Sequence, residues 1–246
     1  MRNLIAFIPA RKGSKRIKNK NIMKLDNHPL LAYSINSALL SNMFTKVFCI
    51  TDSSKYQKIA NYYGADDFPL RPKNLSGSKS PDSSWVSWAI KICKKKKIEF
   101  DDFAILRPTS PFRNKDTIKR AVKEFYKKKA NSLRAVELSK THPGKIWKYQ
   151  KPYIYPILNK KINNVPWHSS QYASLPKFYS QNASLEICNK KKFITENLIA
   201  NKKIIPFFTN NIEGLDINDD VDIIKVNFFL KKNKNIIFKK SWFNVN

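Results

Sequence analysis

The sequence predicts an α/β fold in which a mostly parallel sheet is covered by helices on both faces. Three short apolar runs, at residues 4–8, 47–50 and 103–106, lack polar alternation, as expected for strands buried on both sides. Apolar residues at helical spacing follow each run, and strands that alternate with helices favour parallel pairing through right-handed crossovers. With 246 residues the chain can bury one large core, so we expect a single domain over 1–246.

The predicted helices are delimited by residues typical of helix ends. The first helix is predicted to begin near Pro29, because proline suits the first turn, and the second to end at Gly64. Ser80 and Asn114 are the predicted caps of the next two helices. The remaining predicted elements are an extended piece at 67–72, a strand after Ala183, a strand at 204–208 and an edge element at 236–243.

The strongly basic composition suggests a nucleic-acid partner as one alternative. Lys and Arg number 47 against 18 Asp and Glu, a formal net charge of +29, and dispersed cations bind polyanions through counterion release. The lysines lie all along the chain and at the ends of predicted elements, where solvated charges are common, so this evidence is weak. We expect no nucleic-acid partner, and a basic nucleic-acid-binding protein stays the rival class.

The sequence shows no membrane segment and no zinc-binding pattern. No apolar run approaches the roughly 20 residues of a membrane span, and the first run ends at Pro9, too soon for a signal peptide. We therefore expect a soluble cytoplasmic protein without a membrane partner. The three cysteines are far apart and the three histidines lack metal-ligand spacing, which argues against a disulfide framework or a zinc site.

A cationic loop directly after the first apolar run carries the strongest functional signal. Residues 4–21 read LIAFIPARKGSKRIKNKN and hold six Lys and Arg residues around Gly13 and Ser14. Backbone N–H groups at Gly13 and Ser14, together with the cations, suit a polyphosphate, and ligands of open α/β sheets lie beyond the carboxyl ends of strands. A solvated basic loop is the alternative. The motifs G-x-x-x-x-G-K-[ST] and G-x-G-x-x-G are absent, so neither an ordinary P-loop NTPase nor a dinucleotide-binding enzyme is supported.

Two later loops place arginine where a ligand would lie. Arg71 ends the extended piece, and the serine-rich segment 75–84 then opens a helix whose N-terminus suits an anion. The third apolar run leads into RPTSPFR at 107–113, where Arg107 and Arg113 place guanidinium groups at the mouth of the site. A rigid turn fixed by two prolines is the alternative, and both interpretations can hold.

The densest acidic stretch of the chain is predicted to bind Mg²⁺. Residues 214–222, GLDINDDVD, gather four carboxylates within seven residues of an otherwise basic chain. Mg²⁺ takes oxygen ligands and commonly binds one or two carboxylates plus substrate phosphates. The alternative is helix capping, with Asp219 and Asp220 in the first turn of a helix. The apolar face of that helix is predicted to consist of Val221, Ile224 and Phe228.

Four ordered motifs resemble those of the acylneuraminate (sialic acid) cytidylyltransferases, which activate nine-carbon and eight-carbon acidic sugars. The motifs are PARKGSKRIKNKN at 9–21, LRPTSPFR at 106–113, QNAS at 181–184 and DINDDVD at 216–222. The resemblance implies a Rossmann-like fold of the nucleotide-diphospho-sugar transferase type, CTP and an acidic nine-carbon sugar as substrates, and Mg²⁺ as cofactor. It also implies a homodimer, in which an excursion at 139–180 carries the dimer contact and contributes to the neighbouring subunit's sugar pocket.

The resemblance implies roles for individual residues. The catalytic residues would be Arg11, Lys20 and Asp216. The nucleotide would be bound by Pro9, Ala10, Arg11, Gly13, Ser14, Lys20, Asn21, Arg71 and Ser84. The sugar would be bound by Arg107, Thr109, Ser110, Lys145, Gln181 and Asn182, and the metal by Asp216 and Asn218.

Three positions depart from the family pattern. Arg107 stands where the family has a glutamine, and Arg only donates hydrogen bonds whereas Gln also accepts them. Tyr172 stands where the family often has an arginine, and Asn218 where its second metal-side aspartate lies. The sugar therefore stays open among sialic, legionaminic, pseudaminic and related acids. Another sugar nucleotidyltransferase, such as the CMP-KDO type, is the nearest alternative enzyme.

Overall fold

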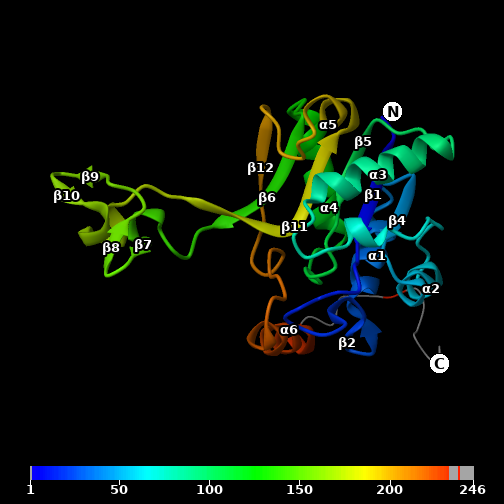
Figure 1. Ribbon diagram of the computed structural model, residues 1–246, viewed down its shortest axis with the longest axis horizontal. Helices are drawn as coiled ribbons and strands as arrows, with labels where there is room; N and C mark the ends of the chain where they lie inside the picture. The colour runs from blue at the N-terminus through cyan, green and yellow to red at the C-terminus, as the bar shows by residue number, and fades with distance from the viewer. Residues whose placement is uncertain (1, 233–237, 239–246) are drawn as a thin grey trace. The chain divides into compact units, whose positions relative to one another are not determined.

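The computed structural model describes residues 2–232 and 238, and the chain divides into two compact units. The first unit combines Met1–Ala135 with Asn182–Asn246, and the second is Val136–Gln181. The central six-stranded sheet has the strand order β12-β6-β11-β5-β1-β4 (Figure 1). The excursion predicted at 139–180 lies within the second unit.

Parallel pairing is present in one half of the sheet, as predicted. β1 (Leu4–Pro9) pairs in parallel with β4 (Lys46–Ile50) on one side and with β5 (Asp102–Ile105) on the other. β11 (Tyr179–Asn189) pairs antiparallel with β5, so the sheet is mixed beyond this point. The two remaining strands are β6 (Ser132–Leu138) and β12 (Ile204–Phe208).

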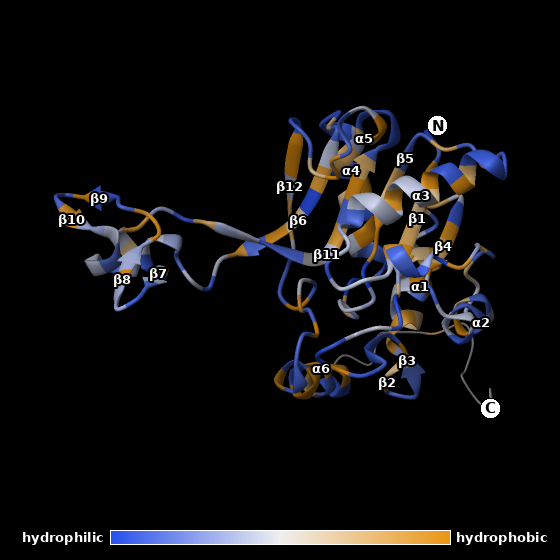
Figure 2. Ribbon diagram, viewed as in Figure 1, coloured by the Kyte–Doolittle hydropathy of each residue, from blue (hydrophilic) through white to orange (hydrophobic). Residues whose placement is uncertain are grey.

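Alternate residues of β1 point to the two faces of the sheet and fill two cores. Leu4, Ala6 and Ile8 belong to one core and Ile5 and Phe7 to the other, and all five are buried. Burial of each large side chain contributes roughly 1.5–3 kcal/mol, and Figure 2 shows apolar residues along the central strands. The α/β class with helices on both faces is therefore confirmed. The first core is covered by α1 (Leu30–Ser41), α2 (Ser54–Tyr62) and α4 (Lys115–Lys127), and the second by α3 (Asp82–Lys95) and α5 (Lys190–Glu196).

A third apolar cluster fixes α6 (Asp220–Lys232) against the start of α1. Val226 and Leu230 of α6 pack in this cluster with Leu30 and Tyr33. The predicted apolar face of this helix is wrong, because both possible faces have the same spacing of three and four residues. The side chains of the predicted face, Val221, Ile224 and Phe228, are 58%, 69% and 52% exposed.

Short elements lie between β1 and α1 and before α3. The 3-10 helix at Lys20–Ile22 ends the cationic loop, and the hairpin of β2 (Lys24–Leu25) and β3 (His28–Pro29) leads into α1. A further 3-10 turn, Lys73–Leu75, precedes the serine-rich segment. These turns connect the sheet to the loops at its carboxyl end.

The two predicted helix caps have different outcomes. Asn114 caps α4 as predicted, since its side-chain oxygen accepts hydrogen bonds from the backbone N–H groups of Asp116 and Thr117, both at 2.9 Å. The predicted Ser80 cap is wrong, because the Ser80 hydroxyl donates to the Asn74 carbonyl oxygen at 3.4 Å and caps no helix.

The strand predicted after Ala183 begins earlier than expected. β11 starts at Tyr179, so Gln181 and Asn182 lie within it. The stretch 67–72, predicted as an extended piece, belongs to no helix or strand. The edge element predicted at 236–243 lies outside the described residues, apart from one position.

The second unit contains hairpins of its own rather than one long loop. Its two antiparallel pairs are short, and 3-10 turns lie before the first pair and after the second. The pairs are β7 (Trp147–Gln150) with β8 (Tyr153–Pro156) and β9 (Lys161–Ile162) with β10 (Val165–Pro166). The 3-10 turns are Pro143–Lys145, Trp167–Ser169 and Tyr172–Ser174.

An aromatic cluster around His142 holds this second unit together. The His142 ring contacts Trp167, Tyr172 and Phe178 edge to face, with centroids 4.9 to 6.1 Å apart. The backbone N–H of Gly144 donates to Nδ1 of His142 at 3.0 Å, so the imidazole is buried and hydrogen-bonded. These contacts indicate that His142 stabilises the second unit.

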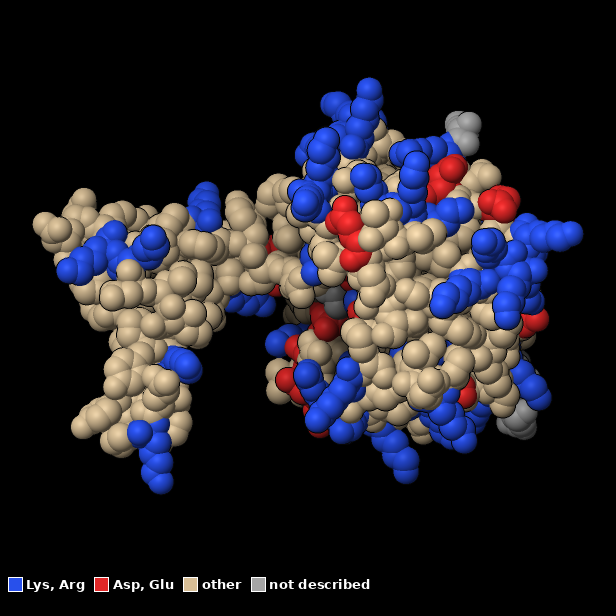
Figure 3. Space-filling model, turned by 45° about the horizontal axis from the view of Figure 1, so that its top comes forward, with Lys and Arg blue, Asp and Glu red and all other residues tan. Residues whose placement is uncertain are grey.

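The surface of the described part is rich in cations. On the face that Figure 3 shows, Lys and Arg side chains are scattered, and Asp and Glu lie among them. None of the described helices has both the length and the apolar character needed to cross a bilayer.

Candidate active site

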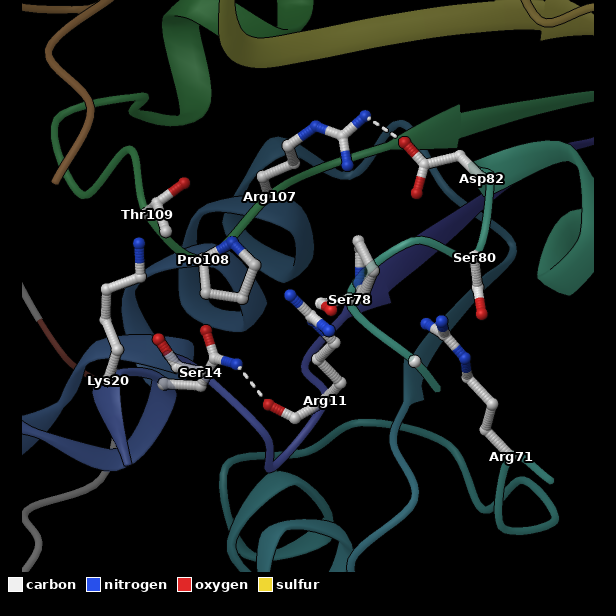
Figure 4. A pocket seen from close by; sticks show the side chains of 13 residues that line it. Arg11, Ser14, Lys20, Arg71, Ser78, Ser80, Asp82, Arg107, Pro108 and Thr109 are labelled. Atoms are coloured by element: carbon white, nitrogen blue, oxygen red, sulfur yellow. Dashed lines mark hydrogen bonds and ion pairs between the residues drawn. The ribbon is translucent and has the colours of Figure 1, made fainter. Parts of the chain in front are cut away.

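A cavity of about 320 Å³ opens beyond the carboxyl ends of β1 and β5 in the first unit (Figure 4). Its walls come from the loop after β1, from Arg71, from the segment that leads into α3 and from the loop after β5. Open α/β sheets bind their ligands in this position. The lining residues are Pro9, Arg11, Ser14, Lys20, Asn21, Arg71, Gly77, Ser78, Ser80, Asp82, Arg107, Pro108 and Thr109.

Eight predicted site residues line this cavity, and the rest lie elsewhere. The eight are Pro9, Arg11, Ser14, Lys20, Asn21, Arg71, Arg107 and Thr109. Ala10 is part of the first apolar core, Ser110 is buried, and Ser84 lies on α3. Gly13 is exposed in its loop, and Asn182 donates from Nδ2 to the Thr209 hydroxyl at 2.9 Å. Lys145 and Gln181 belong to the second unit. The roles of all these residues stay predictions.

Hydrogen bonds along the cationic loop decide which groups it offers to a ligand. Asn21 donates from Nδ2 to the Arg11 carbonyl oxygen at 2.9 Å, and the Lys12 N–H donates to Asp52 Oδ1 at 2.8 Å. The Ser14 N–H donates to the Lys12 carbonyl oxygen at 2.9 Å, so it is used within the loop. The loop therefore presents side chains to the cavity, chiefly those of Arg11, Ser14 and Lys20.

Lys20 links the cationic loop to the acidic stretch near the end of the chain. Its Nζ donates to the Ile217 carbonyl oxygen at 2.6 Å, and the Ile217 N–H donates to the Thr109 carbonyl oxygen at 2.9 Å. Burial lowers the pKa of Lys20 below its ordinary value, and the nearby Asp216 carboxylate opposes this shift. Three loops distant in sequence thus meet at one lysine.

Asp216 has the character of a cation ligand in this arrangement. Its Oδ1 is buried and has no hydrogen-bond partner among the described residues, which is costly for a carboxylate oxygen. Its Oδ2 accepts from Nδ2 of Asn218 at 2.8 Å, and Oδ1 of Asn218 accepts from Arg16 at 3.1 Å. Asn218 therefore orients Asp216 and uses its own oxygen for Arg16.

The described residues contain no group of three or more His, Cys, Asp or Glu side chains suited to a metal. A cation at Asp216 would therefore need further ligands from a substrate, as Mg²⁺ commonly does when it binds phosphates. The orphan Oδ1 fits this arrangement.

The serine-rich segment is folded around Arg71 and Arg11. Nε of Arg71 donates to the Leu75 carbonyl oxygen at 2.9 Å, and the guanidinium lies 5.6 Å from the centroid of the Trp85 ring. Nη1 of Arg11 donates to the Ser76 carbonyl oxygen at 3.3 Å. The segment that leads into α3 and the two cations of Arg11 and Arg71 therefore share one side of the cavity, which suits an anion.

Arg107 and Arg113 have different environments, although both were predicted at the mouth of the site. Arg107 lines the cavity, whereas Arg113 is fully buried and donates to the carbonyl oxygens of Arg107 and Ser184 and to the Ser34 hydroxyl. The prediction for Arg113 is wrong, because this arginine stabilises the loop from beneath. A buried guanidinium with several acceptors is a structural feature of the loop.

Carboxylates on two sides hold Arg107. Its Nη2 donates to Asp82 Oδ2 at 2.7 Å and to Glu186 Oε1 at 2.8 Å, and Glu186 also binds Arg134. Burial alone would lower the pKa of Arg107, but Glu186 and Asp82 outweigh it, so the pKa of Arg107 is raised. Asp82 is held in turn by the Trp85 Nε1–H at 2.7 Å.

Residues 5–203 match the family model described as Cytidylyltransferase. The chain belongs to the cytidylyltransferase family. Because the match spans most of the chain, it confirms the family predicted from the four motifs, and with it the predicted enzyme class, a nucleotidyltransferase.

Other cytidylyltransferases resemble the chain over most of its length. N-acylneuraminate cytidylyltransferase of Escherichia coli is 33% identical over 233 residues, covering 94% of this chain but 53% of that protein, so the chain spans about half of that relative. CMP-N,N'-diacetyllegionaminic acid synthase of Legionella pneumophila is 30% identical over 228 residues, covering 89% of this chain and 92% of that protein. A solved structure of CMP:2-keto-3-deoxy-manno-octonic acid synthetase complexed with CTP has a TM-score of 0.67 at 11% identity, covering 94% of this chain and 99% of that one, which shows the shared fold.

Several residues that line the cavity of this cytidylyltransferase were not predicted from the sequence. Gly77, Ser78 and Ser80 line it, whereas Ser84 was predicted to bind the nucleotide. The serine run signalled the segment but not which of its members faces inward. Asp82, which lines the cavity, and Glu186, which binds Arg107, were also missed, although a single glutamate in the apolar strand SLEIC was a usable signal.

Proposed function

We propose that the protein transfers a cytidylyl group from CTP to a nonulosonic, sialic-acid-like sugar, giving a CMP-sugar and pyrophosphate. The observation that carries the proposal is the convergence of Arg11, Lys20 and Arg71 in one cavity at the carboxyl end of the parallel strands. Relatives named for N-acylneuraminate and N,N'-diacetyllegionaminic acid support this class of sugar.

In the proposed reaction the anomeric hydroxyl oxygen of the sugar loses its proton and bonds to the α-phosphorus of CTP, while the bond to pyrophosphate breaks. Such a displacement requires alignment and neutralisation of charge on the phosphoryl and leaving oxygens. Arg11 and Lys20 supply this charge, and the remaining predicted nucleotide residues that line the cavity hold CTP. The α3 N-terminus adds favourable dipole charge for an anion.

We propose Mg²⁺ as the cofactor, with Asp216 as its protein ligand. The unpartnered Oδ1 of Asp216 supports this assignment, and Asn218 contributes by orienting the carboxylate. When bound, Mg²⁺ would neutralise charge on the triphosphate oxygens. The contact between Lys20 and Ile217 keeps the cationic loop beside this carboxylate.

The sugar site of the first unit is proposed to include Arg107, Thr109, Ser110 and Asn182. The sugar-binding roles of Lys145 and Gln181, which belong to the second unit, stay predictions from the sequence. A homodimer formed through the second unit is also proposed. Tyr149, Tyr153 and Ile154 of this unit are 67%, 65% and 55% exposed, and such apolar groups are costly to leave in water. The cytoplasmic location stays a prediction from the sequence.

Pyrophosphate release tests the proposal directly. The protein is supplied with Mg²⁺, each of the four nucleoside triphosphates in turn, and a panel of nonulosonic acids that includes sialic, legionaminic and pseudaminic acids. The expected result is release that needs both CTP and one acid. Release with an eight-carbon acid or another sugar alone would assign a different sugar nucleotidyltransferase.

The rival class, a basic nucleic-acid-binding protein, predicts the opposite result in this assay. A basic nucleic-acid-binding protein would bind arbitrary duplexes with an affinity that falls steeply as salt rises. It would release no pyrophosphate from CTP. This combination would overturn the proposed function.

A further inference from the structure

The guanidinium of Arg107 is divided into an anchored part and a free part. Both N–H bonds of a terminal guanidinium nitrogen can donate, and Nη2 of Arg107 donates to two carboxylates, Asp82 and Glu186. Among the described residues, Nη1 and Nε of Arg107 have no hydrogen-bond partner. Figure 4 shows one nitrogen of Arg107 directed at Asp82 and another turned toward the cavity.

The anchor is itself rigidly held. The side chain of Glu186 is 8% exposed, and its two oxygens are divided between Arg107 and Arg134. On the other side, Asp82 lies in the first turn of α3 and accepts from the Trp85 indole N–H at 2.7 Å. The two carboxylates and two guanidinium groups balance in charge, so the cluster is internally neutral.

The free part of Arg107 faces a region of the cavity away from the other cations. Arg107 follows β5, whereas Arg11 and Lys20 follow β1, and Figure 4 shows the Arg107 guanidinium apart from these two cations. If Arg11 and Lys20 bind the triphosphate, Arg107 is left for a second anionic group. A guanidinium N–H matches a carboxylate oxygen well and binds it more strongly than a neutral acceptor.

We propose that Asp82 and Glu186 position Arg107 so that its free Nη1 group binds the carboxylate of the acidic sugar. This inference rests on the proposed function and names the group of the sugar that the site recognises. Arg107 is the binding residue, and Glu186 is a positioning residue that acts through it. The family has a glutamine at this position. Glutamine carries no charge, so it would leave the carboxylates of Asp82 and Glu186 without a cation between them.

Steady-state kinetics with matched variants test the inference. In Arg107→Gln and Glu186→Gln, KM for the sugar acid should rise about 10- to 100-fold, the effect of losing one charge-assisted hydrogen bond, while KM for CTP stays within about threefold. Glu186→Asp should restore part of the loss. Asp102→Asn is the control, because Asp102 is buried on the same pair of strands at their other end and bonds Asn189 instead.

A sugar analogue separates carboxylate binding from a general defect. With the wild type, the carboxamide form of the sugar should show a KM as high as Arg107→Gln shows for the acid. In Arg107→Gln, the KM values for the acid and for the carboxamide should be equal. A variant that raises KM for CTP instead, or that still discriminates the acid from the carboxamide, would overturn the assignment.

A measurement without turnover keeps this inference separate from the proposed function. In nitrogen-15 NMR spectra of the unliganded protein, the signal of the Arg107 guanidinium is identified by its absence from the spectrum of Arg107→Gln. This signal should show slow rotation of the guanidinium in the wild type and in Asp102→Asn. It should average rapidly in Glu186→Gln. Rapid averaging in the wild type would overturn the positioning role. Slow rotation in a wild type that releases no pyrophosphate with any substrate would overturn the proposed function but not the anchor.

Discussion

Lys20 is the single residue on which the proposed chemistry depends most. Its ammonium group lines the cavity and is held by the Ile217 carbonyl oxygen at 2.6 Å. A cation fixed in this way stabilises charge that develops on phosphoryl oxygens without having to reorganise during the reaction. Arg11 lines the same cavity from the same loop, so the two charges act together.

Lys20→Ala is expected to lower kcat/KM by ~100-fold or more, about 3 kcal/mol, as removal of an oxyanion-binding donor does. Lys18→Ala is the matched control, since Lys18 is exposed in the same loop and is not among the lining residues of the cavity. Initial rates of pyrophosphate release measure both variants. Near-normal turnover of a folded Lys20→Ala protein would refute the role of Lys20.

His28 is expected to make stability fall in acid. Burial lowers the pKa of His28 below its ordinary value of 6.5, against a smaller opposing effect of Asp26, and its Nδ1 lies 2.9 Å from the Tyr63 hydroxyl. Because the folded pKa is depressed, the unfolded chain binds more protons below pH 6.5, and the free energy of unfolding decreases as pH falls through this range. Urea unfolding at several pH values should show a larger acid loss for the wild type than for His28→Gln, and equal losses would contradict this.

At this scale the sequence predicted which residues carry charge to the site but not how they are held. Arg11, Lys20, Arg71 and Arg107 all line the cavity: the first two lie in the loop after β1, Arg107 lies in the loop after β5, and Arg71 lies in the stretch 67–72. The partners of Glu186 could not be predicted, since they lie far away from it in the chain. Contacts of that kind depend on the tertiary fold rather than on local pattern.

The turn before α6 is the element that joins the acidic stretch to the cationic loop. Ile217 is fully buried in the third apolar cluster, while its backbone N–H and carbonyl oxygen bond Thr109 and Lys20. The apolar side chain therefore fixes the position of the polar backbone groups on either side of it. Packing of Ile217 therefore stabilises the contact between the cationic loop, the loop after β5 and the turn before α6.

Ile217→Ala should lower the free energy of unfolding by about 2–5 kcal/mol, because it removes buried methyl groups and leaves a cavity. The same change should weaken CTP binding, since the carbonyl that holds Lys20 loses its anchor. Ile224→Ala on α6 is the control, as Ile224 is 69% exposed, and it should change stability by about 0.5 kcal/mol or less. Urea titrations and calorimetry measure the two effects, and equal stability of both variants would contradict the account.

Elements were predicted best where the burial pattern leaves no choice of face. The strands β1, β4 and β5 are apolar on both faces, so no choice of side was needed. For α6 the spacing allowed two faces, and only packing against Leu30 and Tyr33 decides between them. The Ser80 cap failed because a serine can bond the backbone of a turn as readily as that of a helix.

For the molecule as a whole, the proposed homodimer makes the sharpest prediction. Ile154→Lys places a charge on β8 of the second unit, where the side chain is 55% exposed. Sedimentation should show a dimer for the wild type and a monomer for the variant, because burying an unpaired charge in an interface is costly. Lys161→Ala in the same unit is the control, and a monomeric wild type would contradict the prediction.

We propose that the cationic loop and the turn before α6, which the contact between Lys20 and Ile217 joins, together bind a nucleoside triphosphate and its metal ion. A crystal structure with CTP and Mn²⁺ in place of Mg²⁺ tests it most directly, because the anomalous signal of manganese locates the ion independently. We expect the ion at Oδ1 of Asp216, with the triphosphate between it, Arg11 and Lys20. An ion bound away from Asp216, or CTP bound outside this cavity, would contradict the claim.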